Sequence, residues 1–223
     1  MAKGDGHRKA YTVSMKHIIT VQHTQSIHHI NGMVGSWTDW ELTDFGKQQA
    51  DLIGKKLAEE LDSIVPVIYS SDLLRARQTA EIIANHLGVS LILREELRER
   101  NLGKCCGRSV QWLRGNMEAQ EKTVDDRMFS DAESIRDVWN RLEPFFNEML
   151  HNDHETIIIV SHGGLLSVFN AMFIGLDVEA MNNGNIHGRS GGVSSFMIRD
   201  DGKRSVQGIS DMSYLIEEAG SIV

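Results

Sequence analysis

Four short apolar runs divide the chain, and each gives way to polar residues. Runs of this length that are rich in β-branched residues are typical of buried strands in a parallel sheet. Between and after them, apolar positions recur at helical spacing. The alternation predicts an α/β fold, a three-layer sandwich whose mostly parallel central sheet carries helices on both faces. The expected strands are 18–21, 67–69, 91–93, 157–160, 193–198 and 206–209, and the expected helices are 43–61, 73–86, 110–122, 130–149 and 163–174.

Several residues predict where these helices begin and end. Thr43 is suited to an N-cap, and Gly88 stands where a C-cap glycine is expected. The run Ser130-Asp-Ala-Glu133 has the form of a capping box. Pro144 falls inside the helical pattern that follows, so we expect it to kink or divide that helix. The helix over 110–122 is only weakly amphipathic.

Length and composition favour one domain. The chain has 223 residues, 41% hydrophobic and 24% charged, which suits a soluble domain with its own core. Residues 1–14 are polar and patternless, and we interpret them as a leader or a frayed extension before a single domain over 15–223. The segment 211–223 has no predicted structure.

Net charge and cysteine content limit the partners and the cellular compartment that we expect. A formal net charge of -8 lacks the basic footprint that nucleic-acid binding requires. No apolar run approaches the roughly 20 residues of a membrane span, and no secretory segment opens the chain. Cys105 and Cys106 are adjacent, which does not suit a disulfide framework. We therefore expect a cytoplasmic protein without membrane or nucleic-acid partners.

Two of the predicted strands end in a histidine. His23 follows the first strand, and His162 follows the Thr156–Val160 run in the sequence Ser161-His162-Gly163-Gly164. Ligands of open α/β sheets bind at the carboxyl ends of the strands. One such histidine is an ordinary loop residue, but the pair predicts two imidazoles that face one crevice.

An arginine and a glutamate are expected at the same edge. Arg75 falls in the first turn of the helix that follows the 67–69 strand, where free N–H groups and a guanidinium together favour a phosphate. Glu99 follows the third strand and could serve as a general acid. Taken singly, each is equally consistent with a solvated surface residue, and Arg77 is expected on the surface.

Together these stretches resemble the histidine phosphatase superfamily, also called phosphoglycerate mutase-like. The first motif of that family, Arg-His-Gly, appears as Gln22-His23-Thr24. Segment 35–46 resembles the family's loop into its first helix, and 70–80 resembles its second motif. Segment 97–107 resembles the stretch that carries the acid. The last motif appears at 160–164, and 132–141 resembles the helix before it. The resemblance covers residues 16–196.

The resemblance implies a phosphomonoesterase with a phosphohistidine intermediate and the phosphoglycerate mutase-like fold. His23 would attack phosphorus, Arg75 and His162 would hold the phosphoryl oxygens, and Glu99 would protonate the leaving alcohol and then activate water. Such phosphoryl transfer needs positioning and charge stabilisation, so no cofactor or metal is implied. The partner would be a small phosphorylated molecule or inorganic phosphate, and a homodimer is left open. Substrate contacts are expected from Gln22, Gln25, His29, Ser36 and Gly163.

The chain departs from the family pattern at the motif arginine, where it carries Gln22. Loss of a buried cation from an oxyanion site costs on the order of 2–4 kcal/mol. Thr24 replaces the motif glycine, and His28 and His29 stand where many members carry Trp and Asn. Three consequences stay open: His28 or His29 restores positive charge, turnover is slow, or the protein binds phosphorylated ligands without turnover.

Other functions compete with hydrolysis. A binding or regulatory module would use the same pocket in degraded form. A mutase is disfavoured because only 63 positions separate Glu99 from His162, where the family's mutases usually carry a longer insertion. A metal hydrolase built on His23, His28 and His29 is the least favoured, since no carboxylate partner is evident.

Overall fold

The computed structural model describes residues 15–216, so the predictions for residues 1–14 and 217–223 lie outside the described part. Its centre is a six-stranded sheet in the order β3-β2-β4-β1-β5-β6. The pairs β3·β2, β2·β4 and β4·β1 are parallel, whereas β5 pairs antiparallel with both β1 and β6. The predicted α/β fold with a mostly parallel sheet is confirmed. The strands are β1 Lys16–Gln22, β2 Val67–Ser70, β3 Leu91–Leu93, β4 Thr156–Ser161, β5 Val193–Ile198 and β6 Arg204–Asp211.

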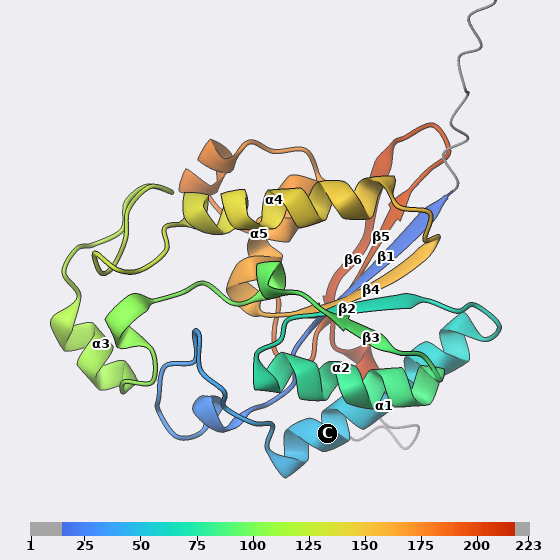
Figure 1. Ribbon diagram of the computed structural model, residues 1–223, viewed down its shortest axis with the longest axis horizontal. Helices are drawn as coiled ribbons and strands as arrows, with labels where there is room; N and C mark the ends of the chain where they lie inside the picture. The colour runs from blue at the N-terminus through green and yellow to red at the C-terminus, as the bar shows by residue number, and fades with distance from the viewer. Residues whose placement is uncertain (1–14, 217–223) are drawn as a thin grey trace, which may run out of the picture.

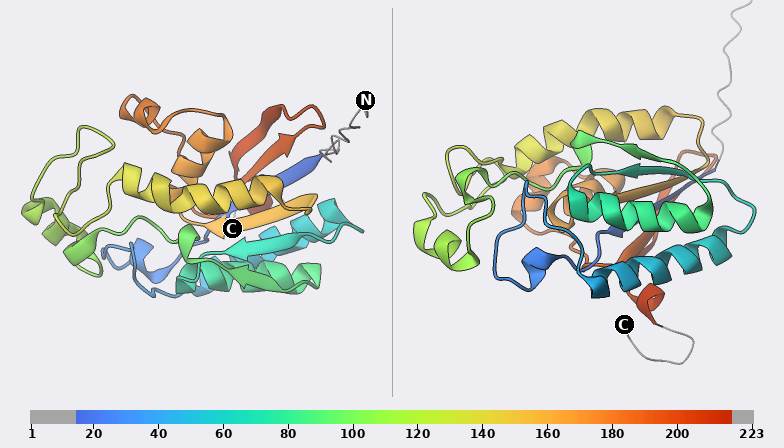
Figure 2. Two further views of the ribbon diagram at one scale, coloured as in Figure 1. Left: turned by 45° about the horizontal axis from the view of Figure 1, so that its top comes forward. Right: turned by 60° about the horizontal axis from the view of Figure 1, so that its bottom comes forward.

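Helices cover both faces of the sheet, which makes three layers (Figure 1). On one face lie α1 Asp44–Leu61 and α2 Leu74–Leu87, and on the other lie α4 Ile135–His151 and α5 Gly163–Phe173 (Figures 1 and 2). Alternation along β1 explains the division, because Ile18 packs with α4 and α5 whereas Ile19 and Val21 pack with α1 and α2. Within residues 15–216 no helix is long and apolar enough to cross a bilayer.

The helix boundaries confirm some predictions and overturn others. The Thr43 side chain accepts a hydrogen bond from the Gly46 N–H, and Gly88 ends α2 with a φ of 66°. The capping box at Ser130–Glu133 was wrong, because Ser134 and Asp137 form it four positions later. Glu133 is instead used by Arg141 and by the Asn101 N–H.

Pro144 does not divide α4, which runs through it. Pro144 has no N–H to donate to the carbonyl oxygen of Asn140, four residues earlier. Asn140 is exposed, so water can bind that oxygen instead. The predicted 110–122 helix is shorter, since α3 spans only Val110–Asn116 and has no buried residue. After β6, part of the unassigned tail forms a 3₁₀ turn, Ser213–Leu215, which packs against α1 with Leu215 buried.

Candidate active site

The carboxyl ends of β1, β4 and β2 bring the predicted residues together. His23 and His162 follow β1 and β4, and their ring centroids lie 5.1 Å apart. Arg75, in the first turn of α2, donates from Nε to the Nε2 of His23 over 3.2 Å. The three side chains are 3%, 0% and 1% exposed, respectively. The predicted convergence of two imidazoles and one guanidinium is therefore present in the described chain.

Hydrogen bonds assign the protons on the His23 ring. Its Nδ1 lies 2.9 Å from the Thr24 carbonyl oxygen, which can only accept, so Nδ1 carries the hydrogen. Nε2 then keeps its lone pair and accepts from Arg75. Burial, and next the Arg75 charge, lower the pKa of His23 well below its ordinary value, so the ring is neutral near pH 7.

His162 is held differently. Its Nε2 lies 2.9 Å from the Ser71 hydroxyl, while Nδ1 is buried and has no partner within residues 15–216. Burial, followed by the charge of Arg75, lowers the pKa of this imidazole well below its ordinary value too. An unpartnered buried nitrogen beside His23 indicates a place for a polar ligand atom.

Arg75 is fixed by the loop that precedes α1. Its two terminal nitrogens donate to the carbonyl oxygens of Thr38 and Ser36, each over 2.8 Å. Ser36 has a φ of 49°, in the left-handed region that non-glycine residues rarely adopt, so the loop carries some strain to present this carbonyl. Burial lowers the pKa of Arg75 to about 10, which still leaves it charged near pH 7.

Glu99 is docked on the first turn of α5, the helix that begins directly after His162. Its carboxylate accepts from the N–H groups of Arg100 at 2.8 Å and of Gly164 and Leu165 at 3.1 Å each. A Cβ at position 164 would come within 2.5 Å of Glu99 Oε1, so only glycine leaves room for this docking. Arg141 and Trp37 hold the backbone carbonyl of the same residue.

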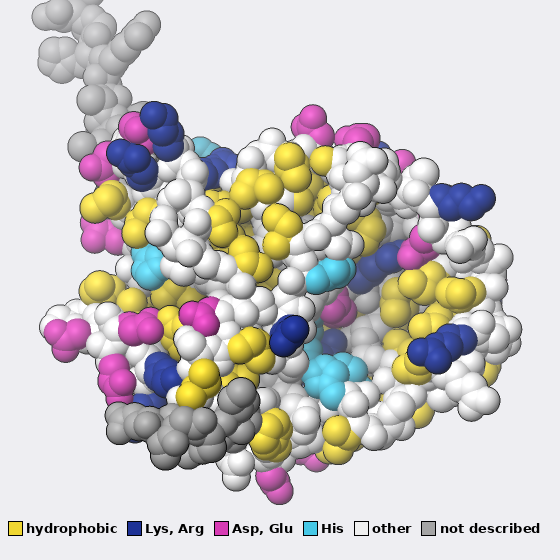
Figure 3. Space-filling model, turned by 180° about the vertical axis from the view of Figure 1, so that it is seen from behind, with side chains coloured by type: hydrophobic (Ala, Val, Ile, Leu, Met, Phe, Trp, Pro, Cys, Tyr) yellow, Lys and Arg dark blue, Asp and Glu magenta, His cyan; other side chains and the backbone are white. Residues whose placement is uncertain are grey.

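A cavity of about 300 Å³ is lined by His23, Arg75 and Glu99, while His162 lies behind His23 and is not among its lining residues. In Figure 3 histidine side chains gather at a hollow on the rear face of the molecule. A second cavity of about 420 Å³ shares Arg100 and Gly164 with the first. The residues that line the first cavity are His23, His28, Val34, Gly35, Ser36, Arg75, Glu99, Arg100, Leu102 and Gly164.

The other expected contact residues fall less directly on the cavity. Gln25 accepts from the Thr43 hydroxyl at 2.8 Å and supports the start of α1. The Gln22 side chain lies against Gly163, where a Cβ would be 3.1 Å from its Nε2, and its buried Oε1 has no partner in the described chain. Neither glutamine is among the residues lining the cavity, and Gly163 and the expected contact residue His29 are not among them either.

His28 and His29 stand close to His23 on a 3₁₀ turn, Ile27–His29. Their rings lie 5.7 and 5.4 Å from that of His23. Burial and then the neighbouring charges lower the pKa of His28 to about 3, and burial and then Arg75 lower that of His29. Neither imidazole therefore carries a positive charge near pH 7 in this structure, so neither restores the charge of the missing motif arginine by itself.

A metal ion does not suit this cluster, although single nitrogen atoms of the three rings lie within 4.8 Å of one another. His23 Nε2 already accepts from Arg75, and His29 Nδ1 already accepts from the Ser26 N–H. The buried guanidinium would also repel a cation. An anion fits the same donors and the same positive charge better.

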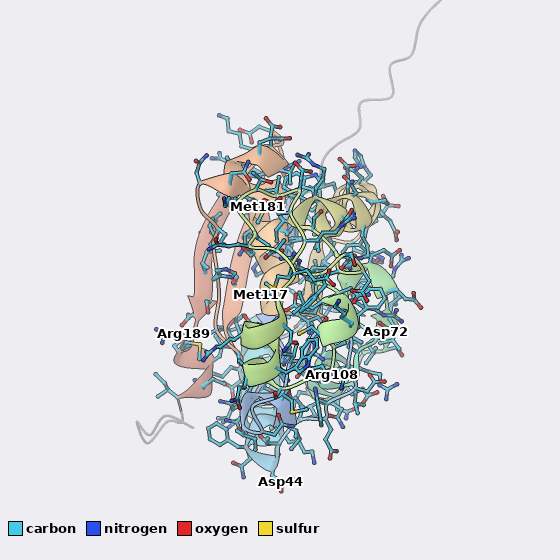
Figure 4. All side chains as sticks on the ribbon, turned by 90° about the vertical axis from the view of Figure 1, so that its left-hand side faces the viewer. Asp44, Asp72, Arg108, Met117, Met181 and Arg189 are labelled. Carbon is cyan, nitrogen blue, oxygen red and sulfur yellow. The ribbon has the colours of Figure 1, made fainter. Side chains whose placement is uncertain are left out.

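Sequence reasoning missed the residues that hold the others in place. Ser26, Gly35 and Ser71 lie in or beside stretches that resemble the family, but none of them was given a role, because serine and glycine are common in loops. The second cavity is also lined by Met181, Asn182, Asn185 and His187, a segment to which no role was assigned. In Figure 4 the labelled Met181 and Met117 lie on different segments of this side of the molecule.

Comparisons with known proteins agree with this geometry. The family model described as the histidine phosphatase superfamily (branch 1) matches residues 18–210. A putative phosphoserine phosphatase 2 of Hydrogenobacter thermophilus is 30% identical over 199 residues, 86% of this chain and 93% of that protein. Phosphoglycerate mutase-like protein 4 of Arabidopsis thaliana is 30% identical over 216 residues, 93% and 90% of the two chains.

Solved structures share the fold. A mutant phosphoserine phosphatase of Entamoeba histolytica, in complex with phosphoserine, superposes with a TM-score of 0.73 at 22% identity, covering 90% of this chain and 100% of the other. At that identity the likeness concerns the fold alone.

Proposed function

Because this chain belongs to the histidine phosphatase superfamily, we propose that it hydrolyses a small phosphomonoester through a phosphohistidine intermediate. The observation that carries the proposal is the His23 ring. The Thr24 carbonyl fixes its tautomer, so Nε2 carries no hydrogen, and this nitrogen accepts a hydrogen bond of 3.2 Å from Arg75 that an incoming phosphoryl group can take over. A neutral buried imidazole with an available lone pair is a competent nucleophile near neutral pH.

The remaining roles follow from position. The Nε2 of His23 bonds to phosphorus while the bond from phosphorus to the ester oxygen breaks. Arg75 and His162 would hold the phosphoryl oxygens. Support comes from the Arg75 hydrogen bond to His23 and from the unpartnered Nδ1 of His162, whose ring centroid lies 5.1 Å from that of His23. Glu99 lines the cavity, and its protonated form, present when the ester binds, gives its proton to the leaving alkoxide. The carboxylate so formed then takes a proton from the water that cleaves the phosphohistidine and releases inorganic phosphate.

A second function, binding of phosphorylated ligands without turnover, is favoured by one specific observation. Gln22 leaves the motif position without a guanidinium, and its Oε1 has no partner within residues 15–216. The relatives named above include both a phosphatase and a mutase-like protein, so transfer to a second alcohol is the further alternative.

The test is phosphate release from a panel of phosphate esters by the wild type, His23→Ala and His154→Ala. His154 is an exposed residue just before β4, so its variant should match the wild type. Release by the wild type that His23→Ala abolishes supports the proposal, and rapid quenching should trap a phosphoryl group on the wild-type chain. If neither protein releases phosphate above blank, hydrolysis is refuted and the binding function gains.

Gln22→Arg is a companion variant. We expect it to raise turnover on generic esters, because a guanidinium makes charge-assisted forks that an amide cannot. Equal or lower turnover would mean that the pocket is adapted to Gln22 rather than impaired by it.

A further inference from the structure

The turn that carries His28 and His29 is organised around Ser26. The Ser26 N–H donates to His29 Nδ1 over 3.2 Å, so the neutral His29 ring carries its hydrogen on Nε2. The Ser26 hydroxyl lies 2.5 Å from His28 Nδ1. Ser26 is fully buried, and it therefore fixes both rings from one anchored position. In each ring Nε2 is the nitrogen left for a ligand.

Gly35 leaves the space in which the His28 ring lies. A Cβ at Gly35 would lie 2.9 Å from both Cδ2 and Nε2 of His28, so only glycine lets the ring rest there. Both residues line the 300 Å³ cavity beside His23. The two rings on the turn have centroids 4.0 Å apart, and the His29 ring lies nearly parallel to that of His23, with an interplanar angle of 7°.

The fixed positive charge available in this cavity is small. Arg100 lines it but is paired with Glu121 and donates to the Glu133 carbonyl oxygen. Arg75 is the other guanidinium among the lining residues, and it is shared among His23 and two carbonyl oxygens. Gln22 is neutral. A dianionic phosphoryl group would thus meet several neutral imidazoles and little free charge.

We propose that His28 and His29 form a proton-dependent anion clamp that takes the place of the missing motif guanidinium. In it the neutral His29 ring donates from Nε2 and His28 takes up a proton, so that binding of a tetrahedral dianion draws a proton into the pocket. The proposal rests on the function proposed above, since it assigns the phosphoryl group to the cavity beside His23. It also defines a different kind of site, in which the second cation appears only when the ligand is bound.

Electrostatics gives the direction of the effect. The groups that face the pair are His23 from β1, His162 at α5, Arg75 from α2, and Glu99 with Arg100 from the segment after β3. In the free protein burial and the Arg75 charge keep the pKa values of both rings low. A dianion reverses the sign of the nearest charge and favours the imidazolium form. His29 is solvent-exposed and His28 partly so, which gives the proton a path.

The experiment uses sulfate as the probe, because it is a tetrahedral dianion that does not itself titrate near neutral pH. Calorimetric titrations of the full chain in two buffers of different ionisation enthalpy, with a chelator present, report the protons taken up per sulfate bound. We expect net uptake for the wild type and an affinity that weakens as pH rises. The double variant His28→Asn/His29→Asn should lose most of the uptake and bind several-fold more weakly, whereas His154→Asn should match the wild type.

Nitrogen NMR of the imidazole rings in the unmodified protein provides a check that does not depend on a variant folding. Sulfate should move the His28 signals toward the imidazolium range, whereas His29 should keep its neutral tautomer because its Nδ1 accepts from the Ser26 N–H. Sulfate binding without proton uptake, unchanged uptake in the double variant, or no sulfate binding overturns the clamp, and none of these results depends on ester hydrolysis. Proton-linked binding without phosphate release would instead count against hydrolysis while leaving the clamp in place.

Discussion

The docking of Glu99 on α5 leads to a sharp prediction, because a single methyl group should disturb it. In Gly164→Ala the new Cβ would lie 2.5 Å from Glu99 Oε1, which is closer than non-bonded atoms can approach. The carboxylate is the end of a flexible side chain, so it should swing away and release the N–H groups of Gly164 and Leu165. The backbone of α5 need not move.

The energies point to a moderate loss of stability and a large loss of rate. A hydrogen bond to a charged group contributes about 1.5–3 kcal/mol net of the bonds to water that replace it, and two such bonds are lost. Alanine gains up to about 1 kcal/mol of helix propensity over glycine. We therefore expect the free energy of unfolding to fall by about 2–5 kcal/mol. Loss of a positioned general acid, by contrast, costs about 10²–10⁴ in rate.

The assay separates acid catalysis from blocked access. An alkyl phosphate needs protonation of its leaving oxygen, whereas a nitrophenyl phosphate has a good leaving group and needs little. For Gly164→Ala we expect kcat/KM to fall at least about 100-fold on the alkyl ester and less than about tenfold on the aryl ester. Gly115→Ala, a helical glycine in α3 with open space where the Cβ would lie, is the matched control and should change neither.

Equal losses on the two esters would refute this reasoning, since they would mean that the methyl group merely obstructs the pocket. An unchanged alkyl rate would refute it in another way, because Glu99 would then not be the acid. Urea unfolding of the same preparations must show that the variant is folded.

Three further predictions follow from contacts around the site. Arg75→Lys should lower kcat/KM about 10²–10³-fold in steady-state assays because an ammonium cannot reproduce three directed N–H bonds, while Arg77→Lys, at an exposed pair with Glu81, should leave it unchanged. Glu133→Gln should lower the free energy of unfolding in urea by about 1–3 kcal/mol, since Glu133 binds Arg141, which holds the Glu99 carbonyl; an unchanged midpoint would contradict this. The Arg98 guanidinium holds the pKa of Asp72 below its ordinary value. The ion pair therefore stabilises the fold above the unfolded pKa of about 3.9, and this stabilisation is lost as pH falls through the folded pKa. Asp72→Asn should make the melting temperature less dependent on pH in the acid range.

The strands and the convergence of His23, His162 and Arg75 could be predicted from the sequence because each depends on local chemistry. A β-branched run that ends in a histidine specifies a buried strand and places the imidazole at its carboxyl end. Parallel pairing of β1, β4 and β2 then brings the two histidines to one edge together with Arg75, which opens the helix after β2. None of these steps needs knowledge of a contact between distant loops.

Ends of helices and loop contacts could not be predicted in this way. Ser130-Asp-Ala-Glu133 satisfies the capping-box pattern, but Ser134 and Asp137 satisfy the same geometry and win because Arg141 and Asn101 bind Glu133. Similarly, the 110–122 segment had a weak apolar stripe. Its partly buried hydrophobic side chains, Val110, Trp112 and Leu113, all lie before position 114, and α3 ends at Asn116 because residues 114–120 are exposed. Where a helix begins or ends thus depends on which of several possible partners each side chain contacts in the folded chain.

The replacement of the motif arginine shows why a departure from a family pattern cannot be judged at one position. Seen alone, Gln22 is a loss of charge. In the folded chain, Ser26 aligns two imidazoles beside His23, and the absence of a Cβ at Gly35 gives one of them its place. A fixed cation binds an anion at any pH below its own pKa, whereas neutral rings bind one strongly only where a proton is available. The same substitution that appears to impair the pocket would therefore make its affinity depend on pH, and the activity of this chain has to be measured across pH before Gln22 is counted as a defect.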